Sequence, residues 1–394
     1  MLGNTYQAIF KHRSEIVEAL VSEGHEVITS FSNGMMGYGE EATGKYHCRF
    51  VEIPISRRTA RITQELGLLR RYYTLMRREK PDAVLAYTVK CDVWGGIAAR
   101  MLNIPFFPNI TGIGKGLDEK GIVQKILIQL YKLAVRKAEA IFFQNPHDRD
   151  FFAGHGIKFK KGIIIPGSGV NLDKYPPFDY PPESPLRFLF NSRIMTAKGI
   201  EQYIDAAHFI KQKYPFTEFH ICGYFEDDAK ADFYRRVIKA ESERGILVYH
   251  DLVDDMREYY RMCHCVILPS YHPEGVSNSL LEAASCARPI ITTNHPGCSD
   301  AVDDGLTGFL IEPRNSRDLA DKIERFIALT NDERKMMGIR GRRKMENEFD
   351  RHIVVDAYLR ELNALKEGKK FPPSREKQGG ISFTVLTPPK MAAK

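Results

Sequence analysis

The 394-residue sequence predicts an α/β protein made of two doubly wound, Rossmann-like domains that face a cleft. Short apolar runs alternate with helical patterns along most of the chain, which is typical of parallel sheets covered by helices on both faces. One proline-rich segment, residues 175–182, interrupts this alternation and is interpreted as a linker. The length also fits two domains of ordinary size.

The first series contains six short apolar runs that predict strands. They lie at residues 26–31, 48–55, 83–88, 106–111, 140–145 and 162–166. Helical patterns lie between them at residues 12–23, 59–78, 93–102 and 123–137.

The start of the chain is short for this fold. Such a domain should open with a buried strand of about five residues, yet only Met1 and Leu2 precede Gly3. We expect Met1 to be an internal methionine of a longer chain or a misassigned start. The alternative is a domain that does without a complete first strand.

The second series follows the same pattern. Its predicted strands lie at residues 186–192, 218–223, 246–250, 265–269, 290–294 and 308–312, and helices are predicted at 277–286, 319–329, 332–347 and 352–366. We therefore expect an N-terminal domain over residues 1–166, a C-terminal domain over 167–346 and a helix over 347–366 that could return to the first domain. Residues 367–394 are polar, proline-containing and basic, and predict a disordered tail.

Composition limits the classes of protein. An apolar fraction of 43% and a charged fraction of 27% are those of a soluble globular protein, and no run of 18 apolar residues predicts a membrane span. The seven cysteines are odd in number and lack the spacing of a disulfide framework, which favours a reducing cytoplasm. The net charge of +7 comes with no nucleic-acid recognition motif.

Two glutamates follow the predicted strand 265–269. Glu274 lies on a loop, and Glu282 lies eight residues later, about two turns into the next helix. A strand, a loop and a helix N-terminus in this order form a common phosphate site, because free backbone N–H groups and the helix dipole meet there. One carboxylate could contact a sugar while the other accepts hydrogen bonds from a ribose. The alternative is that both are solvated surface residues.

Arg193 and Lys198 form a second candidate constellation. They follow the strand 186–192 and precede a helix that starts near Gly199. A guanidinium and an ammonium at this position suit a diphosphate. On spacing alone, plain surface charges are equally consistent.

The string from Pro269 to Glu282 resembles the E-x7-E signature of retaining glycosyltransferases of family 4, which have the GT-B fold. The Arg and Lys are similarly spaced in that family. Within it, the first domain looks most like bacterial transferases that extend lipid-diphosphate-linked sugars for capsule, O-chain or N-glycan assembly. Segments carrying the resemblance are residues 85–90, 94–96, 109–114, 142–146, 167–171, 297–302 and 304–310.

The resemblance implies a role for each site residue. Arg193 and Lys198 would neutralise the leaving nucleotide diphosphate, Glu282 would hold the ribose, and Glu274 would hold the donor hexose. The remaining implied positions are the backbone N–H groups of Gly275, Val276, Ser277 and Asn278 at the hexose, Gly3 and Asn4 near the diphosphate, and Lys90, Thr111 and Gly112 on the acceptor side.

The resemblance also implies a UDP-sugar as donor substrate, a polyprenyl-diphosphate-linked saccharide as acceptor, and neither a cofactor nor a metal. Family members retain anomeric configuration without requiring a protein nucleophile. One departure concerns a histidine that many members carry after the strand at residues 106–111. Here that place holds Asn109-Ile-Thr-Gly112, so either Thr111 and Gly112 shape the pocket or another histidine takes this part. The alternatives are His147, His155, His272 and His295, of which His272, just before Glu274, is favoured.

Residues 57–80 predict a membrane-facing helix. They contain eight Lys/Arg against two Glu, and Ile62, Leu66, Leu69, Tyr73 and Met76 recur at helical spacing. The apolar stripe could face the core while Arg70, Arg71, Arg77 and Arg78 face anionic headgroups. This predicts a peripheral protein on the cytoplasmic face of the membrane. The alternative is an ordinary domain helix with solvated arginines.

Three other functions stay open. A UDP-N-acetylglucosamine 2-epimerase shares the architecture, but no acid/base set for it is recognisable. A dinucleotide-dependent dehydrogenase should show G-x-G-x-x-G after its first strand, which the glycines at 112, 114 and 116 do not match. An inactive binding homologue is the third.

Overall fold

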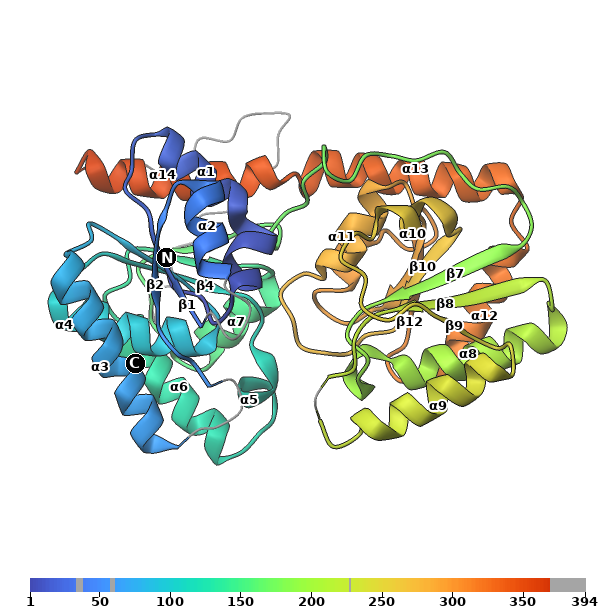
Figure 1. Cartoon of the computed structure of the whole chain (residues 1–394), viewed down its shortest axis with the longest axis horizontal. Coiled ribbons are helices and arrows are strands. Elements are labelled where there is room, and N and C mark those ends of the chain that lie inside the picture. Colours follow the sequence, from blue (N-terminus) through green and yellow to red (C-terminus); the bar gives the residue numbers. More distant parts are fainter. Residues whose placement is uncertain (33–37, 57–60, 227, 369–394) are drawn as a thin grey trace, which may run out of the picture. The chain divides into compact units, whose positions relative to one another are not determined.

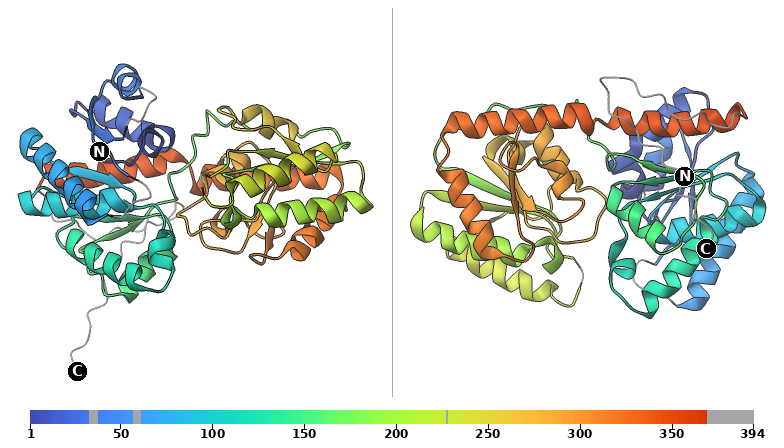
Figure 2. Two further views of the ribbon diagram at one scale, coloured as in Figure 1. Left: turned by 60° about the horizontal axis from the view of Figure 1, so that its bottom comes forward. Right: turned by 180° about the vertical axis from the view of Figure 1, so that it is seen from behind.

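The computed structural model describes residues 1–32, 38–56, 61–226 and 228–368 (Figures 1 and 2). The chain forms two compact units. Unit 1 contains Met1–Gly169 and the chain from Arg351 onward, and unit 2 is Val170–Asp350. The units divide a few residues beyond the expected boundaries at 166 and 346. The expected tail after residue 368, and the expected start of the helix at 59–78, lie outside the described residues.

Unit 1 contains a parallel sheet that includes the very first residues of the chain. Strand β1 pairs with β2, and strands β3, β4, β5 and β6 lie side by side in that order. Leu2 bridges Ser30 of β1 and Ala86 of β3, with its N–H 2.8 Å from Leu85 O and its carbonyl accepting from Tyr87 N–H. Residues 1–3 thus occupy the place of the expected first strand. The strands are β1 (Ile28–Phe31), β2 (Arg49–Glu52), β3 (Val84–Tyr87), β4 (Phe106–Ile110), β5 (Ile141–Phe143) and β6 (Gly162–Ile164).

Two apolar clusters, one on each face of this sheet, make unit 1 doubly wound. One contains side chains of α3, α4, α6 and α7, and the other contains those of α1, α2 and α14. The helices are α1 (His12–Ser22), α2 (Tyr38–Tyr46), α3 (Ile62–Glu79), α4 (Gly96–Leu102), α5 (Gly114–Asp118), α6 (Ile122–Ala134), α7 (Pro146–Gly154) and α14 (Arg351–Lys366), with π-helical turns η1 (Gln7–Lys11) and η3 (Cys91–Gly95).

The C-terminal helix α14 is fixed to unit 1 by buried polar contacts. Arg351 Nη1 lies 2.8 and 2.9 Å from the two carboxylate oxygens of Glu15 in α1. Asn109 Nδ2 donates to Tyr358 Oη at 2.6 Å. The Asn109 side chain, in the segment where the family resemblance implies a histidine, therefore lies in the core.

The buried face of α3 differs from the predicted one. Leu68, Tyr72, Leu75 and Met76 are buried. Of the predicted stripe only Met76 is buried, and Leu69 and Tyr73 are half-buried. Leu69, Tyr73 and Met76 of the predicted stripe thus contact the core, whereas Ile62 and Leu66 are exposed. The expectation that the stripe faces the core was wrong for these two residues, because the buried face is centred on Leu68, Tyr72 and Leu75. Arg70, Arg71, Arg77 and Arg78 are exposed, as predicted.

Unit 2 is a six-stranded parallel sheet in the order β12-β11-β10-β7-β8-β9. The chain runs outward from β7 to β9, returns to the centre at β10 and then runs outward the other way. The order reverses between β7 and β10, which is the position where such sheets bind ligands. The strands are β7 (Leu186–Asn191), β8 (Thr217–Cys222), β9 (Val248–Tyr249), β10 (Cys265–Leu268), β11 (Ile290–Thr293) and β12 (Gly308–Ile311).

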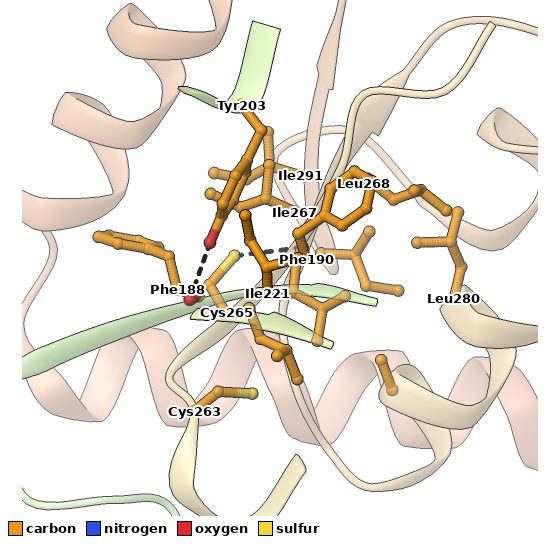
Figure 3. Close-up of a cluster of buried hydrophobic side chains, with 14 of the residues drawn as sticks. Phe188, Phe190, Tyr203, Ile221, Cys263, Cys265, Ile267, Leu268, Leu280 and Ile291 are labelled. Atoms are coloured by element: carbon orange, nitrogen blue, oxygen red, sulfur yellow. Dashed lines mark hydrogen bonds between the residues drawn. The ribbon is translucent and has the colours of Figure 1, made fainter. Parts of the chain in front are cut away.

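Side chains of the central strands fill the core of unit 2 (Figure 3). Phe188, Phe190, Cys265 and Ile267 are fully buried, and Tyr203 donates its hydroxyl to the Phe188 carbonyl at 3.0 Å. The helices are α8 (Ile200–Lys213), α9 (Ala231–Glu243), α10 (Arg257–Met262), α11 (Asn278–Ser285), α12 (Ser316–Ile327) and α13 (Asn331–Glu348), with short 3-10 turns η4 (Thr196–Lys198) and η5 (Ser299–Ala301).

The proline-rich segment at residues 175–182 is not a linker between the units. It lies inside unit 2, where Tyr180 donates its hydroxyl to the His264 carbonyl at 2.9 Å. The buried Arg288 donates to the Asp179 carbonyl at 2.7 Å. Proline keeps such a segment extended, but its aromatic side chains and carbonyls attach it to the domain. The linker interpretation was therefore wrong.

No helix among the described ranges is long and apolar enough to cross a membrane. All seven cysteines are buried free thiols.

Two glycines in α13 provide a test of the packing of this helix. A Cβ at Gly338 would lie 2.1 Å from the Ala287 carbonyl oxygen, whereas a Cβ at Gly341 would make ordinary contacts at 3.8 and 3.9 Å. We expect Gly338→Ala to destabilise unit 2 by about 2 kcal/mol, and Gly341→Ala to stabilise it by up to about 1 kcal/mol, since alanine is the better helix former. Urea unfolding followed by far-UV circular dichroism measures both, and fluorescence of the single tryptophan, Trp94, reports unit 1 as the control. Equal effects of the two substitutions would contradict the packing described.

Candidate active site

Three loops of unit 2 meet at the carboxyl edge of its sheet, where the strand order reverses. They follow β7, β10 and β11, and β10 lies between the other two strands in the sheet. The β7 loop packs closely on the β10 loop, because a Cβ at Gly199 (φ +79°) would lie 2.2 Å from the Pro269 carbonyl oxygen. Tyr271 N–H donates to the Ala197 carbonyl at 2.9 Å. The loops carrying the predicted cations and the predicted carboxylates are therefore held side by side.

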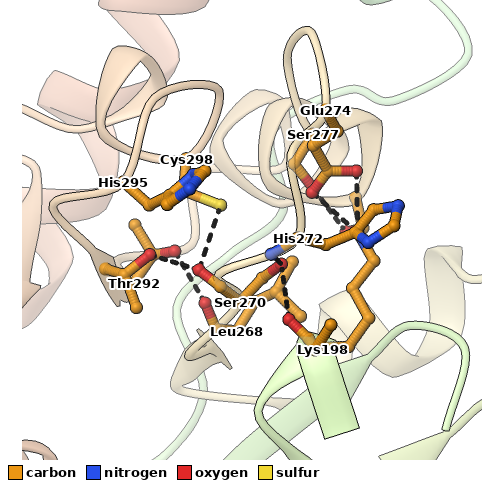
Figure 4. Close-up of polar contacts among 12 residues, drawn as sticks. Lys198, Leu268, Ser270, His272, Glu274, Ser277, Thr292, His295 and Cys298 are labelled. Atoms are coloured by element: carbon orange, nitrogen blue, oxygen red, sulfur yellow. Dashed lines mark hydrogen bonds and ion pairs between the residues drawn. The ribbon is translucent and has the colours of Figure 1, made fainter. Parts of the chain in front are cut away.

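Lys198 and Glu274 form an ion pair at this junction (Figure 4). Lys198 Nζ lies 2.7 Å from each oxygen of the Glu274 carboxylate, and the lysine side chain is buried. Burial alone would raise the pKa of the Glu274 carboxyl, but Lys198 outweighs it and the pKa is lowered, with help from His272 and Arg193. Glu274 is therefore a carboxylate at neutral pH.

Arg193 is also paired with a carboxylate, one that the sequence analysis did not identify. Its Nη1 lies 2.5 Å from Glu226 Oε2, on the loop after β8. A backbone bridge between Ile194 and Phe225 holds the two loops together. Each predicted diphosphate-binding cation thus has a protein carboxylate as its counter-ion.

Glu282 contacts a buried tyrosine. Tyr260, from α10, places its hydroxyl 3.1 Å from Glu282 Oε2. Asn191, the last residue of β7, donates Nδ2–H to the same hydroxyl at 2.7 Å, which leaves the tyrosine proton for the carboxylate. Burial, and next the charge of Glu282, raise the pKa of Tyr260 well above its usual range. Tyr260 is therefore a permanent donor that orients Glu282.

The backbone between the two glutamates is shaped by the β11 loop. Ser277 N–H donates to the Gly297 carbonyl at 2.9 Å, so this N–H is occupied by a loop contact. The Val276 side chain packs in the core of unit 2, which leaves only its backbone for a ligand. Asn278 begins α11, and its buried Oδ1 has no hydrogen-bond partner within the described ranges. Gly275 is buried beside Gly297, where a Cβ would lie 2.5 Å from the Gly275 carbonyl oxygen.

The predicted acceptor-side residues lie in unit 1, all at the carboxyl edge of its sheet. Gly3 and Asn4 follow Leu2, Lys90 follows β3, and Thr111 and Gly112 follow β4. Lys90 forms an ion pair with Glu65, which also accepts a hydrogen bond from Trp94 Nε1. The Lys90 ammonium is thus neutralised by α3.

Sequence reasoning missed Glu226, Tyr260 and Asn191. Glu226 lies shortly after the strand β8 and Gly223. Its place after a strand end, like that of Arg193 after β7, is a signal that could have identified it. Nothing in the local sequence distinguishes Tyr260 from its neighbour Tyr259, since only the fold turns it toward Glu282. His272 lies on the Glu274 loop, as predicted, and its charge contributes to the lowered pKa of that carboxyl.

Two family descriptions match the chain, one in each unit. "Glycosyl transferase 4-like" matches residues 7–145, and "Glycosyl transferases group 1" matches residues 176–344. The chain therefore belongs to the group 1, family 4 glycosyltransferases and is an enzyme of that class.

Curated relatives from bacteria cover most of the chain. The N,N'-diacetylbacillosaminyl-diphospho-undecaprenol alpha-1,3-N-acetylgalactosaminyltransferase of Campylobacter jejuni is 25% identical over 71% of this chain and 76% of its own length. The capsular polysaccharide biosynthesis glycosyltransferase CapM of Staphylococcus aureus is 27% identical over 77% of this chain and 81% of its own. The similarity places the chain among transferases of bacterial polysaccharide and glycan biosynthesis.

Solved structures share the fold. HepE of Anabaena, crystallised in complex with UDP and glucose, superposes with a TM-score of 0.75 at 17% identity, over 92% of this chain and 98% of that one. This likeness confirms the predicted GT-B fold.

The Lys198–Glu274 pair predicts a stability effect with a defined pH dependence. Glu274→Gln leaves the buried ammonium without its counter-ion, and we expect it to cost about 2 kcal/mol of unfolding free energy at neutral pH. Because the folded-state pKa of Glu274 is lowered, its contribution is complete above the ordinary glutamate value near about 4.3 and is lost as pH falls through the folded value. Urea midpoints of wild type and variant should therefore converge in acid.

The double variant Lys198→Met/Glu274→Gln is the matched control. It removes both charges while keeping similar volumes, so it should be more stable than Glu274→Gln alone. A double variant as unstable as the sum of its single variants would show that the two side chains do not interact.

Proposed function

We propose that the protein transfers a hexose or N-acetylhexosamine, with retention of configuration, from a UDP-sugar to a polyprenyl-diphosphate-linked saccharide. The observation that carries this proposal is the meeting of Arg193, Lys198, Glu274 and Glu282 at the reversal point of the sheet in unit 2. Two cations suit a diphosphate there, and two carboxylates suit hydroxyl groups of a sugar and a ribose.

In the proposed reaction the bond between the sugar C1 and the diphosphate oxygen breaks, and the electron pair leaves with the diphosphate. Arg193 and Lys198 stabilise the charge that develops on it, and the dipole of α11 adds to their field. An acceptor hydroxyl attacks C1 from the same face and gives its proton to the departing phosphate oxygen. No protein nucleophile and no metal take part in this scheme.

Glu282 is proposed to accept hydrogen bonds from the ribose hydroxyls, oriented by Tyr260. Glu274 is proposed to accept hydrogen bonds from hydroxyls of the hexose. Asn278 Oδ1, which is buried and has no hydrogen-bond partner among the described residues, is a further candidate acceptor. Lys198 and Arg193 must exchange their carboxylate partners for the diphosphate when the donor binds.

The acceptor and the location rest on the names of the relatives. One acts on an undecaprenol-diphosphate-linked sugar, and another serves capsule synthesis. A lipid-linked acceptor favours a peripheral enzyme on the cytoplasmic face of the membrane, with Gly3, Asn4, Lys90, Thr111 and Gly112 on the acceptor side.

Nucleotide binding is the first test of the donor site. UDP at about a hundred times its dissociation constant should stabilise the protein by about 2.7 kcal/mol, visible as a thermal shift, while GDP, ADP and NAD should give smaller shifts. Glu282→Ala should abolish the UDP shift. Glu258→Ala, which removes an exposed glutamate on α10, is the control and should keep it.

Absence of a shift with every nucleotide, on folded wild-type protein, would contradict the proposed activity. Incubation with the UDP-sugar alone separates an epimerase, because an epimerase converts the sugar without any acceptor.

The Arg193–Glu226 pair predicts a variant that binds the donor more tightly. Glu226→Gln removes the carboxylate that competes with the diphosphate for Arg193. We expect the Kd for UDP to fall by about two- to fivefold, which corresponds to the free energy of a partly exposed ion pair. Calorimetric titration measures this change. Glu218→Gln breaks a similar pair with Arg187 on the sheet and should leave the Kd unchanged. Weaker binding by Glu226→Gln would mean that Glu226 supports the site instead of competing with its ligand.

A further inference from the structure

Unit 1 exposes large apolar side chains at the N-terminal ends of two helices. On α6, Ile122, Val123 and Ile126 are 77%, 62% and 53% exposed. On α3, Ile62 and Leu66 are 76% and 55% exposed. These five side chains, here called the apolar tip, are far more exposed than their hydrophobicity favours, and exposed apolar clusters of this kind mark interaction sites.

The two halves of the apolar tip lie at the same end of unit 1. Helices α3 and α6 both pack against η3, and Figure 1 shows their N-terminal ends at the lower edge of the unit, an arrangement that the view from behind also shows (Figure 2). The opposite faces of the helices are used for folding, since Ile128, Tyr131 and Ala134 of α6 are buried in the core. The side chains of the apolar tip therefore do not contribute to the core that folds the unit.

The charges around the apolar tip are mainly positive. Five Lys/Arg and no acid lie between Lys120 and Lys137, and only Asp118 and Glu119 precede them. On α3, Glu65 pairs with Lys90, and Glu79 pairs with Arg78 and Arg49, so both acids of the helix are neutralised by the protein. No described carboxylate pairs with Arg70 or Arg77. This surface complements an anionic partner.

The spacing of apolar and basic residues fits the layers of a bilayer. A helix rises about 1.5 Å per residue, so Arg70 and Arg71 lie about 12 to 14 Å above Ile62 along α3. Apolar side chains of interfacial helices enter about 5 to 10 Å below the headgroups. With the apolar tip at that depth, the arginines reach the phosphates. A soluble protein partner would not require apolar side chains at the helix ends and basic side chains one headgroup layer further along the helix.

We infer that the apolar tip inserts into an anionic lipid bilayer, with Arg70 and Arg71 at the level of the headgroups. The choice of a lipid surface rests on the proposed lipid-linked acceptor. The inference goes beyond the predicted arginine face by assigning insertion to α6 and the start of α3. The predicted stripe residues Ile62 and Leu66 then contact lipid instead of the core.

Vesicle sedimentation with the full chain tests this inference. Wild-type protein should sediment with vesicles of phosphatidylcholine and phosphatidylglycerol in equal parts, and less with phosphatidylcholine alone. The double variant Ile122→Glu/Ile126→Glu should bind the mixed vesicles at least about tenfold more weakly, since two large apolar side chains are lost from the interface. Arg70→Gln/Arg71→Gln should reduce binding mainly at low salt.

The matched control is Phe216→Glu, which changes an exposed apolar residue (47% exposed) before β8 in unit 2. It should bind vesicles as wild type does. The inference is overturned if wild type does not sediment with anionic vesicles, if the isoleucine variant binds normally, or if Phe216→Glu is equally impaired. It is also overturned if the isoleucine variant instead converts a dimer into a monomer, because the tip would then cover a second copy.

The UDP thermal shift is measured on the same variants. A normal shift in the isoleucine variant shows that the protein is folded and its donor site intact, so its loss of vesicle binding belongs to the apolar tip. Vesicle binding by a wild type that shows no nucleotide shift would support the membrane inference while contradicting the proposed donor.

Discussion

Every named strand pair in the described sheets is parallel, and the candidate site depends on this constraint. Parallel strands put all their carboxyl ends, and the loops that follow, at one edge of a sheet. In unit 2 the reversal of strand order brings the loops after β7 and β10 together at that edge. Residues 76 positions apart in sequence, Lys198 and Glu274, can therefore pair directly.

The cations of the candidate site are neutralised by carboxylates of the protein itself. Lys198 and Arg193 are each paired with a carboxylate, and Glu282 is held by Tyr260. An unpaired buried ammonium would be costly to the fold, so the internal counter-ions make the proposed diphosphate site compatible with a stable domain. The same pairs keep the cationic side chains ordered, which reduces the conformational entropy lost when a ligand binds.

Much of the fold followed from sequence periodicity. The strand series, α1, α3, α11, α13 and α14 appear where apolar runs and helical spacing predicted them, because burial imposes those periods. The proline-rich segment was misinterpreted, since composition does not reveal that Arg288 binds its carbonyls. The buried face of α3 was predicted only in part, because two apolar stripes overlap on that helix and the tertiary packing decides how far each is covered.

The site divides in the same way. Arg193, Lys198, Glu274 and Glu282 belong to local patterns next to strand ends, which a sequence exposes. Glu226 and Tyr260 act through contacts made across loops and helices 33 and 22 positions away. Such partners depend on the tertiary arrangement and leave no local signature. The three residues at the start of the sheet in unit 1 are a further case, because their role depends on the hydrogen bonds that Leu2 makes to β3 and that Met1 and Gly3 make to β1.

The paired cations have a consequence for how the site would respond to ionic strength. A bare cationic pocket is surrounded by mobile anions, and a diphosphate that displaces them binds more weakly as salt is added. In the proposed donor site the anions to be displaced are Glu226 and Glu274, which are covalently part of the protein and whose local concentration salt does not change. Donor capture would then be an exchange of partners within the site, buffered against the changing salt content of the cell.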